Sequence, residues 1–161
     1  MARGRHWPLR TAGVLAAAVG LLMGTASPAP AQDPSDPFAP LRRLTGNPVT
    51  VPPRALAVIP ERHAGRHLRV IDVLESVDPQ FDDLARGFGL SHELAIQLRL
   101  REAHIPIFVA KTEASISTVL QLRLGSTVEV RGVLIARGGR YLFLASEVRP
   151  SNGAGRGRRG R

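Results

Sequence analysis

The sequence predicts a mainly β domain in which strands dominate over two short helices, and three observations support this. Apolar runs rich in β-branched residues occur at strand length after residue 64. One of them, Leu94–Leu100, alternates strictly between two kinds of side chain, which is the period of a half-buried strand. The two longest runs are joined by Gly138-Gly139, which suits a two-residue hairpin turn.

The first predicted strand is His67–Val77, and a short helix is expected to follow it. Asp78 fits the N-cap of that helix and Pro79 fits its first position. Gly87 and Gly89 are typical of its end. The apolar stripe of this helix has helical spacing and consists of Phe81, Leu84, Ala85 and Phe88.

The second predicted strand, Leu94–Leu100, is expected to have one buried face and one face in water. Next comes a third strand, Ile105–Val109, in which Pro106 lacks an amide donor, so the start of the strand belongs at an edge or outside the ladder. In the second strand we expect Leu94, Ile96, Leu98 and Leu100 to be buried and Ala95, Gln97, Arg99 and Arg101 to be solvated.

A second helix is expected after Thr112, which fits an N-cap, and it ends before Gly125. Two long strands follow, Thr127–Arg137 and Arg140–Arg149. The apolar phase changes across Gly132, which indicates a bulge or a sharp bend. The stripe predicted for the second helix is Ile116, Val119, Leu120 and Leu124.

The last strand lacks a clear wet face, because Leu142 and Leu144 alternate with Tyr141 and Phe143. Two explanations stay open. Either the proline-rich segment before the domain covers this strand, or the domain is a different small barrel or a half-open sandwich.

In this order of elements the segment 65–150 resembles the OB-fold. The resemblance covers about 86 of the 130 residues that follow residue 31. It implies a small five-stranded Greek-key barrel, with a helix between strands 3 and 4 and a short helix in the loop between strands 1 and 2. The matching segments are Leu68–Leu74, Leu94–Leu100, Ile105–Val109, Glu113–Arg123, Val128–Ile135 and Tyr141–Val148.

Residues 1–31 have the three parts of a secretory signal peptide: a basic start, an apolar run at Ala12–Met23 and small residues at Ala29 and Ala31. Cleavage is expected before Gln32. The apolar run is shorter than the roughly 20 residues that a bilayer-spanning helix needs, so an uncleaved anchor is the weaker alternative. We therefore expect a periplasmic or extracellular protein with no stable membrane insertion after cleavage.

Two further segments flank the predicted barrel domain. Residues 32–64 contain seven prolines and are expected to form a linker or arm that packs on the domain near Leu56, Val58 and Ile59. Residues 151–161 form a tail rich in glycine and arginine. Loose contact of this tail with an anionic polymer or a membrane is the alternative to a merely solvated end.

The net charge of +9 is concentrated outside the predicted barrel. The segment 1–31 contributes +3 and the tail 151–161 contributes +4, whereas 32–64 and 65–150 contribute +1 each. A strongly basic protein often binds nucleic acid through phosphate contacts. Here the folded part is close to neutral, which makes nucleic acid the second choice of partner.

The sequence shows no catalytic set. Cysteine is absent, which excludes disulfides, thiolate metal sites and cysteine nucleophiles. His92-Glu93 lacks the second histidine of a zinc-protease motif, and Gly65 separates His63 from His67. We therefore expect no enzyme, no metal and no cofactor.

Binding is the remaining class of function. In OB-fold proteins ligands usually lie across the second and third strands, between the loop joining strands 1 and 2 and the loop joining strands 4 and 5. The resemblance maps this surface to a predicted strip that could attract anions, although a solvated strand face is the simpler interpretation. The predicted strip consists of Gln97, Arg99, Arg101, Lys111, Arg137, Arg140 and Tyr141.

Two functional hypotheses follow. The first is an exported, non-enzymatic binding or adaptor module for a protein, an anionic envelope polymer or a small anion. The alternative is a nucleic-acid-binding protein that uses the face of the second and third strands. Stacking platforms are scarce in this sequence, because Phe81 and Phe88 are expected in the core, and this favours the first hypothesis.

Overall fold

The computed structural model describes residues 36–78, 81 and 83–151. The expected signal segment 1–31 and residues 152–161 of the expected tail lie outside the described residues. Within the described part, no helix is long and apolar enough to cross a membrane.

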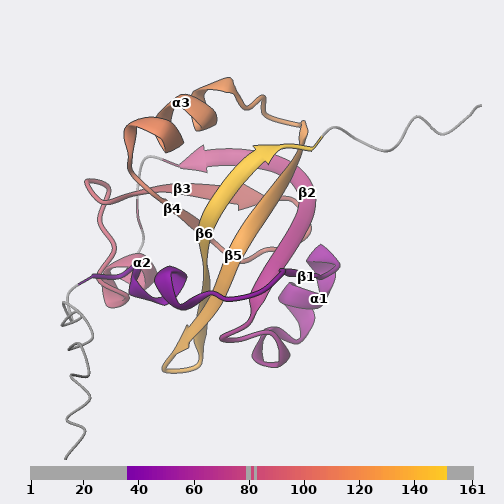
Figure 1. Ribbon diagram of the computed structural model, residues 1–161, viewed down its shortest axis with the longest axis vertical. Coiled ribbons are helices and arrows are strands. Elements are labelled where there is room, and N and C mark those ends of the chain that lie inside the picture. Colours follow the sequence, from indigo (N-terminus) through magenta and orange to yellow (C-terminus); the bar gives the residue numbers. More distant parts are fainter. Residues whose placement is uncertain (1–35, 79–80, 82, 152–161) are drawn as a thin grey trace, which may run out of the picture. The chain divides into compact units, whose positions relative to one another are not determined.

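Five strands form a closed barrel in the neighbour order β2-β3-β4-β6-β5, and pairing of β2 with β5 closes it (Figure 1). A two-residue strand, β1 (Val49–Thr50), adds to β2 in parallel. The barrel strands are β2 (His67–Asp78), β3 (Ala95–Leu100), β4 (Ile107–Ala110), β5 (Thr127–Arg137) and β6 (Arg140–Pro150). The predicted mainly β barrel is confirmed.

Short helices fill the connections between the strands. Before the barrel come the 3₁₀ helix η1 (Ala39–Arg43), α1 (Pro53–Val58) and the 3₁₀ helix η2 (Pro60–Arg62). The loop between β2 and β3 contains α2 (Asp83–Gly87), and α3 (Glu113–Gln121) joins β4 to β5. The predicted cap of α3 is confirmed, because the Thr112 side chain accepts a hydrogen bond from the backbone of Ser115.

Apolar side chains from all five strands fill the barrel interior. Helices cover its two ends: Val119 of α3 packs into the interior from one end and Leu56 of α1 from the other. Figure 1 shows the two helices on opposite sides of the strands. Segment 36–64, which belongs to the predicted linker or arm, therefore supplies part of the core.

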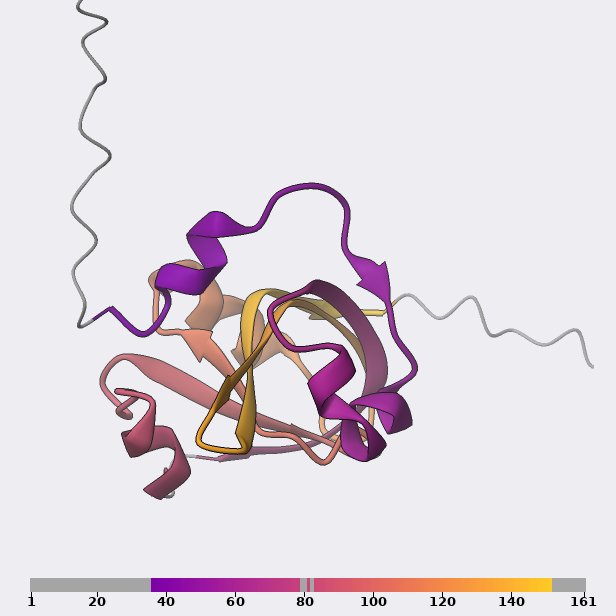
Figure 2. The same ribbon diagram turned by 90° about the horizontal axis from the view of Figure 1, so that it is seen from below.

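A second apolar cluster lies on the outside of the barrel wall. Leu142 and Leu144 of β6 and Val133 of β5 face outward there, under Phe38, Leu41 and Leu44 of the arm. The arm runs around the outside of the barrel in Figure 2. Of the two explanations for the missing wet face of the last strand, the structure therefore shows the first.

The predicted irregularity at Gly132 is present, but the extra residue belongs to the partner strand. The pairing shifts between Arg131 and Gly132, because Ser146 of β6 is skipped in the register. On β5 itself the alternation does not change. Val133 and Ile135 point outward, as Arg131 does, and they are apolar because the arm covers them.

Three expectations for local structure are wrong. Asp78 is the last residue of β2 and not an N-cap, and α2 begins at Asp83. The outer face of β3 is only partly wet: Ala95 and Gln97 are buried, whereas Arg99 is exposed as predicted. Leu94, expected to be buried, is exposed. Leu120 of α3 is exposed although it belongs to the predicted stripe, and Leu124, also exposed, lies beyond the end of the helix at Gln121. Contacts outside the local segment explain these differences: Asp78 pairs with Gln97 of β3, and the burial of the side chains depends on which other elements pack on them.

Candidate binding cleft

One end of the barrel, which we call the mouth, is formed by α1, the turn 101–106 and the hairpin between β5 and β6. Asp72, a buried carboxylate of β2, shapes the turn by accepting hydrogen bonds from the backbone N–H groups of Glu102 (2.8 Å) and Ala103 (3.1 Å). His104 follows with a φ of 52°, in the left-handed region. Phe143 N–H then donates to Pro106 C=O at 2.9 Å, which joins the turn to β6.

The mouth contains a cleft of about 460 Å³, which we call the mouth cleft. Its walls come from four separate parts of the chain. A second, more polar depression of about 250 Å³, the side cleft, adjoins it and shares Leu84, His104, Ile105 and Pro106. The mouth cleft is completed by Leu56, Ala57, Pro60, Gly139, Arg140 and Tyr141, and the side cleft by Glu75, Arg99 and Leu100.

The structure brings three residues of the predicted strip to these clefts. Arg140 and Tyr141 line the mouth cleft, with Arg140 exposed and Tyr141 half-buried. Arg99 lines the side cleft, and its Nε donates to Asp78 Oδ2 at 2.6 Å. Arg99 is therefore already paired with a carboxylate, whereas Arg140 places a positive charge at the rim of the mouth cleft.

The other residues of the predicted strip lie elsewhere. Arg137 donates to the C=O of Gly87 at 2.8 Å and so ties the hairpin to α2. Lys111 donates to the C=O of His92 at 3.1 Å, and Arg101 is exposed just beyond β3. Gln97 is fully buried, and no group of the described residues bonds its side-chain amide, so its predicted place on a wet face is wrong.

Several residues of the mouth cleft were not in the predicted strip. Leu56 and Pro60 belong to the arm, Leu84 to α2, and His104 and Pro106 to the turn after β3. Apolar residues at the end of the arm were the available sequence signal, and they indicated packing rather than a site. No local pattern places the arm beside a hairpin more than 70 residues away in the sequence.

The pairing of the strands identifies the fold. β2 pairs with both β3 and β5, which closes the barrel, and β4 pairs in parallel with β6. The helix α3 lies between the third and fourth barrel strands, which are β4 and β5. This barrel is an OB-fold. No family model matches the sequence, and a search of the curated proteins finds no match.

Solved structures with a similar fold include three different kinds of protein. OBody AM1L10 bound to hen egg-white lysozyme has a TM-score of 0.46 and 14% identity, over 68% of this chain and 100% of that chain. The Entamoeba histolytica asparaginyl-tRNA synthetase in complex with asparaginyl-adenylate has a TM-score of 0.45 and 13% identity, over 65% of this chain and 24% of that one. A Replication Protein A heterotrimer bound to ssDNA has a TM-score of 0.36 and 13% identity, over 52% and 56%. The chain thus spans about a quarter of the synthetase and just over half of the matched replication protein chain.

The face that OB-folds usually present to ligands is covered in this protein. It corresponds to the outer surface of β3 and β4, where Gln97 and Phe108 are fully buried. Phe81, from the loop between β2 and β3, packs edge-on against Phe108 with ring centroids 5.2 Å apart. The loop thus occupies this face, and the open concave surface beside it is the mouth cleft.

The strongest electrostatic feature lies on the outer surface of β2, β5 and β6, away from the mouth. The buried carboxylate of Glu129 accepts hydrogen bonds from Arg69 (2.7 Å), Arg131 (2.8 Å) and Arg149 (2.8 Å). The bond from Arg69 contributes most and, with those from Arg131 and Arg149, outweighs burial, so the pKa of Glu129 is lowered to about 2. These arginines are engaged within the protein, so we read the cluster as structural.

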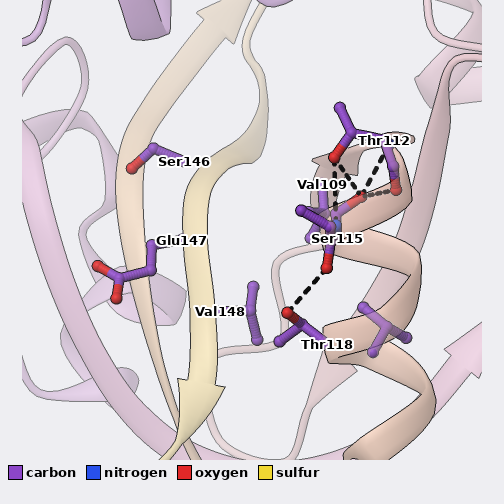
Figure 3. A pocket seen from close by; sticks show the side chains of 9 residues that line it. Val109, Thr112, Ser115, Thr118, Ser146, Glu147 and Val148 are labelled. Carbon is purple, nitrogen blue, oxygen red and sulfur yellow. Dashed lines mark hydrogen bonds between the residues drawn. The ribbon is translucent and has the colours of Figure 1, made fainter.

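A smaller groove of about 190 Å³ lies between α3 and β6 (Figure 3). Its serine and threonine hydroxyl groups are engaged within the protein, by the α3 helix and its cap and by backbone carbonyl groups of the neighbouring strands. Ser115 Oγ donates to the C=O of Ala110 at 2.6 Å and takes part in the cap with Thr112, and Thr118 Oγ1 donates to the C=O of Ala114 at 2.9 Å. Glu147 forms ion pairs with Arg131 and Arg149. This groove is therefore a weaker candidate than the mouth cleft.

Metal binding has no support in the described part of the chain. Across residues 36–78, 81 and 83–151, no group of three or more histidine, aspartate or glutamate side chains could hold an ion together.

Proposed function

We propose that this protein is an exported, non-enzymatic OB-fold module that binds an anionic ligand in its mouth cleft. One observation supports this site above the others: the β3–β4 face is buried under the loop, while the adjoining cleft is open and has Arg140 at its rim. Export is supported by the three-part signal pattern of residues 1–31. A non-enzymatic role is supported by the sequence, which contains no cysteine nucleophile and no complete zinc-protease motif.

The proposal is tested by anion binding and by one pair of variants. Fluorescein-labelled poly-glutamate is titrated with the full chain and followed by fluorescence anisotropy. Arg140→Ala is expected to weaken binding roughly fivefold, because it removes about 1 kcal/mol of charge attraction at the rim. Arg123→Ala, an exposed arginine beyond the end of α3, is the control and should leave binding within twofold. Equal losses in the two variants would overturn the proposed site.

Nucleic-acid binding is the second candidate, because Arg99 and Arg101 are both exposed near the end of β3. A labelled thymidine oligonucleotide of about 15 nucleotides tests it, since that length covers the site of an OB-fold. Micromolar binding at physiological salt that is lost in the Arg99→Ala, Arg101→Ala double variant would favour this candidate. Retained binding after removal of residues 151–161 would show that the tail is not responsible.

A non-enzymatic role has its own check. Generic ester, phosphate and glycoside substrates are incubated with the full chain, and reproducible turnover would overturn this part of the proposal.

A further inference from the structure

We infer that the ligand of the mouth cleft is an extended acidic peptide segment of a partner protein that inserts one large apolar side chain into the cleft. This inference rests on the proposed function, since it names the ligand class for the same site.

The apolar character of the walls argues for an apolar side chain in the ligand. Leu56 and Pro60 of the arm lie on one side of the mouth cleft, and Leu84, Ile105 and Pro106 line it from α2 and the turn. These side chains offer no hydrogen-bond donors or acceptors to a small inorganic anion. A volume of about 460 Å³ is also far larger than such an ion fills, and an apolar group would displace water from these walls.

The charges at the rim argue for acidic neighbours of that side chain. Arg140 is exposed at the hairpin end of the mouth cleft, and His104 is exposed where the two clefts join. In the side cleft, Glu75 is exposed and Arg99 is bonded to Asp78, so the excess positive charge belongs to the hairpin end. An acidic residue next to the inserted side chain would therefore meet Arg140.

The shape favours an extended segment over a compact ligand. The mouth cleft and the side cleft share four residues and adjoin, so the depression continues past the position of a single side chain. A peptide can place one side chain in the first cleft and continue along the second. The walls are mainly aliphatic, with Tyr141 as the aromatic residue that lines the clefts, which suits a side chain better than a series of stacked bases.

The test compares three labelled eight-residue peptides for binding to the full chain by fluorescence anisotropy. The first alternates leucine with glutamate, the second has serine in place of leucine, and the third has lysine in place of glutamate. The first is expected to bind at least tenfold more tightly than either of the others. A labelled thymidine oligonucleotide is measured beside them, and tighter binding of the oligonucleotide with the same dependence on Arg140 would overturn the inference.

Two pairs of variants place the peptide in the cleft. Ala57→Trp fills the mouth cleft from an exposed position on α1, and Val58→Trp puts the same side chain on the neighbouring exposed position, which does not line the cleft. Ala57→Trp and Arg140→Glu are each expected to weaken binding of the first peptide at least tenfold. Val58→Trp and the matched Arg123→Glu should change binding less than twofold. Far-ultraviolet circular dichroism and thermal unfolding confirm that each variant is folded.

The outcomes distinguish a failure of the peptide inference from a failure of the proposed function. If the leucine–glutamate and serine–glutamate peptides bind equally, and both depend on Arg140, the inference fails and the proposed function stands. If no anionic probe depends on Arg140, both fail. Equal effects of Ala57→Trp and Val58→Trp would also overturn the inference.

Discussion

At the scale of single residues, Glu129 shows how the barrel accommodates a buried charge on its surface. Its side chain is only 5% exposed, yet arginines from three strands donate to it: Arg69 of β2, Arg131 of β5 and Arg149 of β6. The same hydrogen bond that lowers the pKa of Glu129 raises the pKa of Arg69. The interaction thus connects the closing pair β2–β5 with the hairpin partner β6.

Because its pKa is lowered on folding, Glu129 makes stability depend on pH. The ordinary value is 4.5 and the folded value is about 2, so the stabilising contribution is complete above about pH 5 and is lost as the pH falls toward 2. Glu129→Gln is expected to lower the free energy of unfolding at pH 7 by roughly 2 kcal/mol. The difference in the free energy of unfolding between this variant and the wild type, measured by urea titration, should become smaller as the pH is lowered from 5 to 2.

Glu147→Gln is the matched control for that measurement. Glu147 pairs with two of the same arginines, Arg131 and Arg149, but its side chain is 43% exposed. An exposed ion pair contributes about 0–1 kcal/mol, so this variant should be nearly neutral. If Glu147→Gln lowered the free energy of unfolding as much as Glu129→Gln does, the stabilising role assigned to Glu129 would be contradicted. A loss in Glu129→Gln that does not change with pH would contradict it as well.

At the scale of elements, the hairpin of β5 and β6 positions both the network and the mouth cleft. Its turn, Gly138 and Gly139, has positive φ at both residues, as the sequence predicted. Farther along, the shift at Ser146 brings the backbone of β6 close to Gly132. A Cβ added at Gly132 would lie 1.9 Å from the backbone oxygen of Leu144, a contact that only a backbone movement can relieve.

Gly132→Ala is therefore expected to destabilise the protein by about 3 kcal/mol, because the clash involves backbone atoms of two paired strands. Gly87→Ala is the control, since a Cβ there meets no heavy atom within 4 Å and its φ is not positive. That variant should be neutral or slightly stabilising. Thermal unfolding compares the two, and similar midpoints would show that the two strands separate without cost at the bulge.

The sequence was sufficient for elements whose signals are local. The glycine turn and the Thr112 cap could be predicted, because short-range geometry decides them. The arrangement of the strands in the barrel depends on long-range pairing and was predicted only from the resemblance to the OB-fold. The predicted N-cap at Asp78 was wrong, because β2 extends to Asp78, which pairs with Gln97 of β3. The carboxylate of Asp78 accepts a hydrogen bond from Arg99, 21 residues away. A pattern within one segment contains no information about such a partner.

The candidate site was predictable to a similar extent. Arg140 and Tyr141 could be placed at a binding loop, because they flank the hairpin turn. Gln97 could not be placed correctly, because the alternation within β3 does not reveal that the preceding loop folds back over the outer face, where Phe81 packs against Phe108, the partner of Gln97 in the strand pairing. Leu56 was expected to pack on the domain, and it does, but its place in the wall of the mouth cleft was not predicted, because the hairpin opposite it is more than 70 residues away in the sequence.

At the scale of the whole molecule, the arm of residues 36–64 joins the two apolar clusters. Phe38, Leu41 and Leu44 cover the outside of β5 and β6, and Val51 and Leu56 enter the barrel interior. The five-stranded barrel without this arm would expose apolar surface on its wall and leave its mouth open. The arm also provides one wall of the mouth cleft, so stability and binding depend on the same segment.

Shortened chains test this dependence. A chain that begins at residue 36 keeps every contact that the structure describes for residues 36–64, and we expect it to unfold in urea as the full chain does. Beginning at residue 47 removes three partly buried apolar side chains, and a loss of roughly 3 kcal/mol is expected at about 1 kcal/mol each. A chain that begins at residue 65 also loses Val51 and Leu56 from the interior, a loss comparable with the whole stability of a small domain. It should show no cooperative transition by circular dichroism, and a transition at the same urea concentration as the full chain would mean that the arm is only a linker.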